Sequence, residues 1–140
     1  MTKGNVRFLD TNVLLRYLLR DDERKAEQAL ALLQRLEKGE EKAVISPLVI
    51  FEVVFTLQKR YRVPREQMRD SLKDILSLRG LQLPGKSLYG RALDIYATKN
   101  ISFADAYHMA YMLGEEIAEV YSWDADFDGV EGITRVEPGA

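Results

Sequence analysis

The sequence predicts an α/β fold, a three-layer α/β/α sandwich with a mainly parallel central sheet. Short β-rich runs alternate with amphipathic helical segments, and no connection between them is long, Ser/Gly-rich or repetitive. Strands separated by helices favour a parallel sheet, because two parallel strands need a crossover connection. The 140 residues are 46% hydrophobic, which is enough for one core and short for two, so we expect a single domain over residues 1–140.

The first expected elements are a strand and two helices. Val6–Leu9 is a short apolar run that ends at the acid Asp10, and the leucine-rich stretch Val13–Leu19 follows after two polar residues. This order predicts a strand, a turn and a helix start. Glu23–Glu37 has apolar residues at helical spacing, acids in its first turn and a Lys-Gly pair after it, which predicts a second helix.

The middle of the chain repeats this alternation. Ala43–Ile45 is a second β-rich run, and Ser46 followed by Pro47 is typical of a helix start, because serine caps a helix and proline fits its first position. The expected elements that follow are a helix over 48–61, a helix over 65–78 ended by Gly80, a strand over 81–83 and a helix over 87–98.

The last third of the chain is expected to contain one helix and two strands. Ser102 and Asp105 have nearly the spacing of a capping box, which predicts a helix that runs to Gly114. A β-rich run over 120–123 ends at Asp124, and residues 133–136 form the last candidate strand.

Composition limits the chemistry. The 20 Lys and Arg against 22 Asp and Glu give a formal net charge of −2, so no global positive field attracts nucleic acid. The absence of cysteine excludes disulfides, thiol catalysis and Cys-ligated metals, so any metal ion would have oxygen ligands. No apolar run approaches the roughly 20 residues of a membrane span, and we expect a cytoplasmic protein without membrane contact.

Four acids occupy positions that a parallel sheet brings to one edge. Asp10 and Asp124 follow predicted strands, and ligands of open parallel sheets bind beyond the carboxyl ends of the strands. Glu52 and Asp105 lie in the first turns of helices that begin at this edge. Glu52 stands in an apolar stretch, where burial of an ionised group is costly unless a cation compensates it. We therefore expect the four carboxylates to converge on one pocket.

A cluster of carboxylates without cysteine or a histidine pair suits hard cations such as Mg²⁺ or Mn²⁺. Such ions lower the pKa of a bound water and neutralise charge during phosphodiester hydrolysis. Each acid taken alone is more often a helix cap or a solvated side chain. The coincidence of four acids favours a metal site.

Four segments carry a resemblance to a known family: Leu9–Leu15, Glu52 after Ser46-Pro47, Ser102–Ala106 and Ser122–Phe127. Together, over Val6–Pro138, they resemble the PIN-domain family and in particular its VapC-like toxin branch. The resemblance implies a single PIN-like domain and an endoribonuclease that depends on Mg²⁺ or Mn²⁺. It also implies the toxin of a type II toxin–antitoxin pair, a homodimer, and a small antitoxin protein that blocks the active site.

The resemblance also implies roles for individual residues. The metal-binding and catalytic acids that it implies are Asp10, Glu52, Asp105 and Asp124. Asp126 is a further candidate ligand, because family members differ in which acid follows this strand. Asn12 and Ser122 would support the acids through hydrogen bonds.

Other interpretations stay open. An RNA-processing PIN nuclease that is not a toxin and a non-catalytic interaction module are alternatives. Residues 80–87 match the P-loop pattern, although a helix is expected before them and a strand inside them. A phosphotransferase of the haloacid dehalogenase type would need an acid where Asn12 stands. His108 is the one histidine in the sequence, and a lone histidine more often has a packing or surface role than a metal-binding one.

Two groups of basic residues could bind RNA, although solvated helix faces explain them at least as well. They are Arg16, Arg20, Arg24 and Lys25, and Lys59, Arg60, Arg62 and Arg65.

Overall fold

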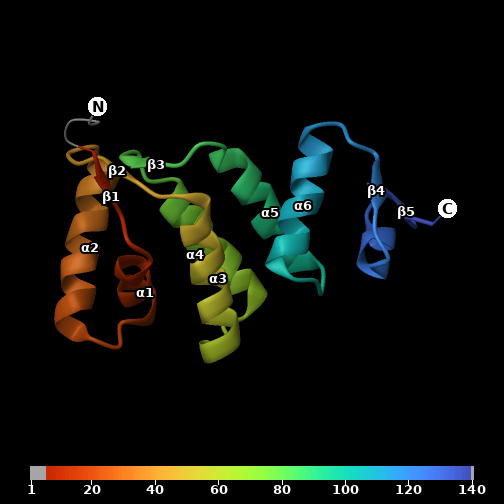
Figure 1. Ribbon diagram of the computed structural model, residues 1–140. Helices are drawn as coiled ribbons and strands as arrows, with labels where there is room; N and C mark the ends of the chain where they lie inside the picture. The colour runs from red at the N-terminus through yellow and green to blue at the C-terminus, as the bar shows by residue number, and fades with distance from the viewer. Residues whose placement is uncertain (1–5, 140) are drawn as a thin grey trace. The chain divides into compact units, whose positions relative to one another are not determined.

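The computed structural model describes residues 6–139. The chain forms two compact units, which we call unit 1 (up to Lys86) and unit 2 (from Ser87). The fold is mixed α/β, as predicted, and every strand pair among the described residues is parallel (Figure 1). The three-layer arrangement stays a prediction. No helix within residues 6–139 is long and apolar enough to cross a membrane.

Unit 1 alternates strands and helices in the predicted order. Its elements are β1 (Arg7–Phe8), α1 (Thr11–Leu19), α2 (Glu23–Lys38), β2 (Ala43–Val44), α3 (Pro47–Tyr61), α4 (Arg65–Leu76) and β3 (Leu81–Gln82). α1 packs against α2 and α3, and α3 packs against α4 (Figure 1). Apolar residues of these helices form the core of the unit: Leu14, Leu36, Ile50, Val53, Met68 and Leu72 are fully buried.

The three strands of unit 1 form one sheet in the order β1-β2-β3. Arg7 of β1 pairs with Ala43 of β2, and Ala43 pairs with Leu81 of β3. Because the strands are parallel, their carboxyl ends lie at one edge of the sheet. Asp10, which precedes α1, and Ser46, which precedes α3, therefore both follow strands at this edge.

The expected end of the helix over 65–78 is wrong. α4 ends at Leu76, where the N–H of Ser77 donates to carbonyls of the last turn, so Gly80 does not end a helix. Gly80 instead lies directly against backbone, because a Cβ on this residue would lie 2.1 Å from the carbonyl oxygen of Glu41. The glycine is required by this close approach.

Unit 2 contains two helices, a short 3₁₀ helix and two strands. Its elements are α5 (Lys86–Thr98), which begins at the boundary, α6 (Phe103–Gly114), β4 (Glu119–Tyr121), η1 (Ala125–Gly129) and β5 (Thr134–Val136). The rings of Tyr89 and Tyr107 lie 5.4 Å apart, and those of Tyr96 and Phe103 lie 5.9 Å apart, so aromatic contacts join α5 to α6.

The predicted strand over 120–123 is shorter than expected. β4 pairs with β5 and ends at Tyr121, and Asp124 comes three residues later. The reason is local: the Ser122 Oγ accepts a hydrogen bond of 2.9 Å from the Asp124 N–H. Such a side-chain bond to the backbone favours a turn over the continued strand.

Candidate metal centre

Three predicted site residues of unit 2 lie close together. Asp105, Asp124 and Asp126 each offer one carboxylate oxygen, and these oxygens all lie within 4.8 Å of one another. Asp105 is half-buried, whereas Asp124 and Asp126 are exposed. Carboxylate oxygens are the ligands that hard divalent cations prefer. The residues present therefore fit Mg²⁺ or Mn²⁺.

The start of α6 positions Asp105. Ser102 is the N-cap of this helix, and its Oγ accepts a hydrogen bond of 3.1 Å from the Asp105 N–H, as the predicted capping pattern requires. Asp105 thus lies in the first turn, where the partial positive charge of the helix N-terminus stabilises a carboxylate.

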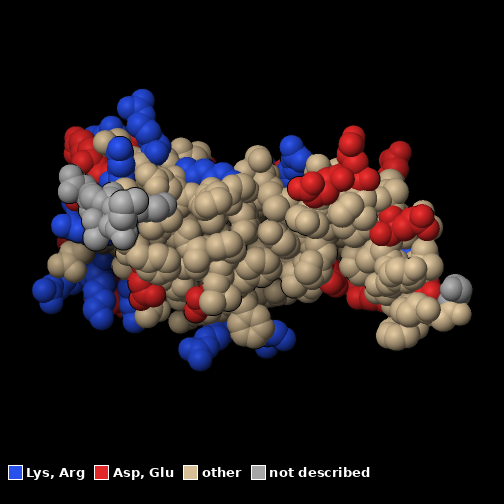
Figure 2. Space-filling view, turned by 45° about the horizontal axis from the view of Figure 1, so that its top comes forward, with Lys and Arg blue, Asp and Glu red and all other residues tan. Residues whose placement is uncertain are grey.

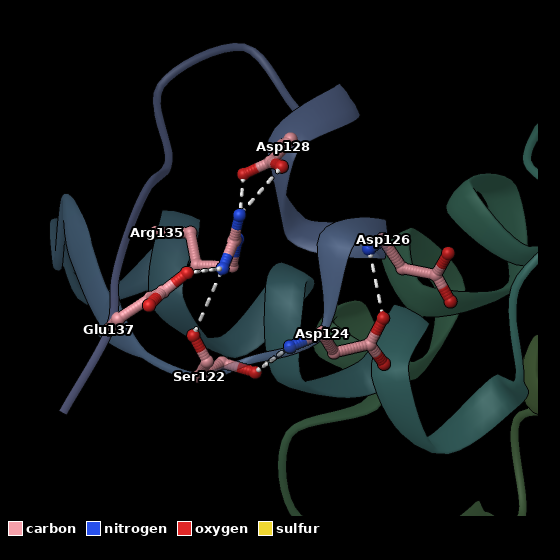
Figure 3. A network of polar contacts seen from close by, with 6 residues as sticks. All are labelled: Ser122, Asp124, Asp126, Asp128, Arg135 and Glu137. Atoms are coloured by element: carbon pink, nitrogen blue, oxygen red, sulfur yellow. Dashed lines mark hydrogen bonds and ion pairs between the residues drawn. The ribbon is translucent and has the colours of Figure 1, made fainter. Parts of the chain in front are cut away.

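A chain of short hydrogen bonds positions the other two acids (Figure 3). The Ser122 Oγ accepts from the Asp124 N–H, and the Asp124 Oδ1 accepts a bond of 2.9 Å from the Asp126 N–H. Asp124 is thereby the N-cap of η1. A carboxylate has further lone pairs, so capping and metal binding are compatible in one side chain.

An arginine lies beside this turn. The Nε and Nη2 of Arg135 donate to the two carboxylate oxygens of Asp128 at 2.9 and 3.2 Å, and Nη1 donates to the Ser122 carbonyl at 3.5 Å (Figure 3). Nη1 also lies 3.4 Å from an oxygen of Glu137. Hydrogen bonding to Arg135 lowers the pKa of Asp128, and the same bonds raise the pKa of the guanidinium.

The predicted site residues of unit 1 lie around the start of α1. Asp10 is exposed at the N-cap position, and its side chain makes no capping hydrogen bond. The Thr11 Oγ1 donates to the Glu52 Oε1 at 3.3 Å, so Glu52 of α3 reaches the residue next to Asp10. Asn12 is exposed on α1.

Two features of unit 1 differ from the expectation. Glu52 lies in an apolar helix, yet its side chain is exposed, whereas its neighbours Val53 and Val54 are buried. The ionised carboxylate is therefore not buried, and the expected cost of burial does not arise. Thr11 was missed as a site residue. Its side chain is buried, with 7% exposed, and its position between Asp10 and Asn12 is the signal that the sequence offers.

The structure thus gathers the predicted residues in two sets. Asp105, Ser122, Asp124 and Asp126 form the set in unit 2, and Asp10, Asn12 and Glu52 form the set in unit 1. Convergence of all the acids on one pocket stays a prediction.

The P-loop interpretation does not fit the structure. α4 precedes the glycine of the pattern, and β3 lies inside the supposed loop. The Lys86 Nζ donates to the Leu78 carbonyl at 3.3 Å, and burial lowers the pKa of this lysine. A phosphate-binding loop needs a strand before its first glycine and a lysine directed at the ligand.

Basic residues line a groove next to Asn12. A cavity of about 400 Å³ between α1 and α2 is lined by Asn12, Arg16 and Lys25 together with apolar side chains. Arg16 is partly neutralised by an ion pair with Asp21 at 2.9 Å. His108 is exposed on α6 with its ring against Tyr107, which confirms a surface position.

Two comparisons with known proteins cover nearly the whole chain. The family model described as "PIN domain" matches residues 7–133, which include parts of both units. The VapC ribonuclease of Aquifex aeolicus (strain VF5) is 27% identical to this chain over 133 residues, which are 95% of this chain and 97% of that protein.

Proposed function

This chain belongs to the PIN domain family, and from this premise we propose that it is a divalent-metal-dependent endoribonuclease that hydrolyses RNA phosphodiester bonds. The observation that carries the proposal is the cluster of Asp105, Asp124 and Asp126. The similarity to a VapC ribonuclease supports RNA as the substrate and a role as the toxin component of a type II toxin–antitoxin pair.

We propose that the predicted acids hold Mg²⁺ or Mn²⁺, within one PIN-like domain over residues 1–140. The proposed ligands are Asp10, Glu52, Asp105 and Asp124, with Asp126 as the alternative to Asp124. In this proposal Thr11 and Ser122 orient Glu52 and Asp124 through the hydrogen bonds described above. Asn12 is the proposed support for Asp10.

When bound, the divalent cation supplies a Lewis acid that activates water and neutralises the charge that develops on the phosphate. The protein contributes fixed carboxylates, whose orientation is set before the substrate arrives. Lys25 and Arg16 offer cations to the RNA backbone next to Asn12. His108 lies on α6 three residues after Asp105, is exposed and has its ring next to that of Tyr107, and the proposal does not require it.

The partners that follow from this proposal are an RNA substrate, a cognate antitoxin protein and a second copy of the chain in a homodimer. We also propose that the protein acts in the cytoplasm.

The test is cleavage of a mixed RNA pool by the purified protein with Mg²⁺, Mn²⁺ or EDTA. We expect cleavage with either metal, none with EDTA, and loss of cleavage in Asp105→Asn with the fold retained. Glu115→Gln, which neutralises an exposed acid at the other end of α6, is the matched control and should cleave normally. Metal-independent cleavage, or full activity of Asp105→Asn, would contradict the proposal.

A further inference from the structure

The turn that carries Asp124 and Asp126 is closed at both ends by one side chain. Arg135 reaches the Ser122 carbonyl at the start of the turn and the Asp128 carboxylate at its end (Figure 3). The two acids of the cluster lie between these contacts. Both ends of the turn therefore contact the same guanidinium, with the shorter bonds at the Asp128 end.

The backbone and the side chain of Arg135 are both held in place. The residue lies on β5, where it pairs with Val120 of β4, so its backbone is fixed by the sheet. Its side chain is 20% exposed, whereas that of Asp128 is 52% exposed. The planar fork of arginine binds both oxygens of Asp128 at once, and lysine cannot reproduce this geometry.

We propose that Arg135 is a positioning residue that holds the Ser122–Asp128 turn in the shape in which Asp124, or Asp126 in its place, binds the divalent cation. The inference rests on the proposed function. Arg135 touches neither metal nor RNA in this proposal and acts through the turn. Outer groups that orient metal ligands typically contribute about 10- to 100-fold to metal affinity.

Two readouts that need no RNA test the inference. Mn²⁺ binding is measured by the electron paramagnetic resonance signal of free Mn²⁺. Trp123 is the single tryptophan of the chain and lies inside the turn, so a change in its fluorescence anisotropy between metal-free variants reports a change in the local order of the turn and of the indole that it carries. Arg135→Ala is expected to weaken Mn²⁺ binding by about 10-fold and to lower the anisotropy of Trp123. Arg135→Lys should give smaller changes in both.

The matched control is Arg35→Ala, which removes an ion pair of the same 2.9 Å length, to Glu41 in unit 1. It should change neither readout. Asp128→Asn keeps an acceptor oxygen and serves as the second variant if Arg135→Ala does not fold, which circular dichroism would reveal. Asp128→Asn is expected to lower the anisotropy of Trp123, which is the readout that the loss of one negative charge does not by itself change.

The outcomes separate this inference from the proposed function. If the wild-type protein binds Mn²⁺ and cleaves RNA while folded Arg135→Ala binds Mn²⁺ equally well, only the inference is overturned. Weaker binding with unchanged anisotropy of Trp123 overturns it as well. If the wild-type protein neither binds Mn²⁺ nor cleaves RNA, the proposed function fails and the inference fails with it.

Discussion

At the scale of single residues, the hydroxyl of Thr11 allows a direct test of how Glu52 is held. Thr11→Val keeps the shape of the side chain and removes the donor to Glu52, whereas Thr11→Ser keeps the donor and removes a methyl group. We expect Thr11→Val to lower RNA cleavage by about 10-fold and to cost roughly 1 kcal/mol of the free energy of unfolding. Thr11→Ser should retain most of the activity.

The measurement is the rate of RNA cleavage at saturating Mn²⁺, together with urea denaturation of each variant. If Thr11 only fills space, the order reverses: the serine variant, which leaves a small cavity, would then be the more impaired of the two. Equal activity of the valine variant and the wild-type protein would contradict a role for the hydrogen bond.

Residues that follow strands could be predicted, and residues that reach across elements could not. The sequence places Asp10 and Asp124 after β-rich runs, and the capping pattern places Asp105 in the first turn of a helix. The role of Arg135 depends on the pairing of β4 with β5. The partner of Thr11 lies 41 residues away in the chain. A local sequence pattern cannot predict contacts between residues that lie so far apart in the chain.

At the scale of elements, Gly80 directly precedes β3 and is hydrogen-bonded to the end of α2. Its N–H donates to the Leu36 carbonyl at 2.8 Å, and its carbonyl accepts from Ala43 of β2 at 2.9 Å. The Cβ of an alanine would lie 2.1 Å from the Glu41 oxygen, so backbone has to move. We expect Gly80→Ala to reduce the free energy of unfolding by about 1–3 kcal/mol or more.

Urea denaturation followed by circular dichroism measures this loss. Gly129→Ala is the matched control, because nothing lies within 4 Å of a Cβ built there, and its effect should stay within about 0.5 kcal/mol. Equal stability of the two variants would show that the connection before β3 can shift freely.

Helix positions were easier to predict than helix and strand ends. α2 has a full amphipathic pattern and a terminal glycine at φ 76°, so both of its ends are encoded locally. α4 ends two residues before the predicted limit, because the Leu78 N–H donates to the Ile75 carbonyl, three residues earlier, at 3.1 Å, and such a bond tightens the last turn. β4 has only three residues, which is too few for alternation to define its end, and the hydrogen bond of Ser122 decides it.

At the scale of the whole molecule, charge is divided unevenly along the chain. Residues 1–86 carry 17 Lys and Arg against 12 Asp and Glu, a formal charge of +5, whereas residues 87–140 carry 3 against 10, a formal charge of −7. In Figure 2 most of the blue side chains lie on unit 1, and red side chains predominate on unit 2. The net charge of −2 conceals this division.

The division predicts where RNA phosphates bind. Unit 1 offers the excess of cations, and Lys25 lines its groove beside Asn12. Each phosphate contact releases counterions, so the loss of one contact lowers the slope of log affinity against log salt by about 0.7 for single-stranded RNA. We expect Lys25→Ala, made in the Asp105→Asn background to prevent cleavage, to weaken RNA binding and to lower this slope.

Lys38→Ala is the matched control, since Lys38 is exposed on the same helix but does not line the groove. Fluorescence titrations of labelled RNA at several salt concentrations give both slopes. A lower slope for Lys25→Ala alone supports binding along the groove, because the two variants remove the same charge from the same unit. If both variants lower the slope equally, RNA affinity depends on the total charge of unit 1, and the groove is not the binding site for the phosphates.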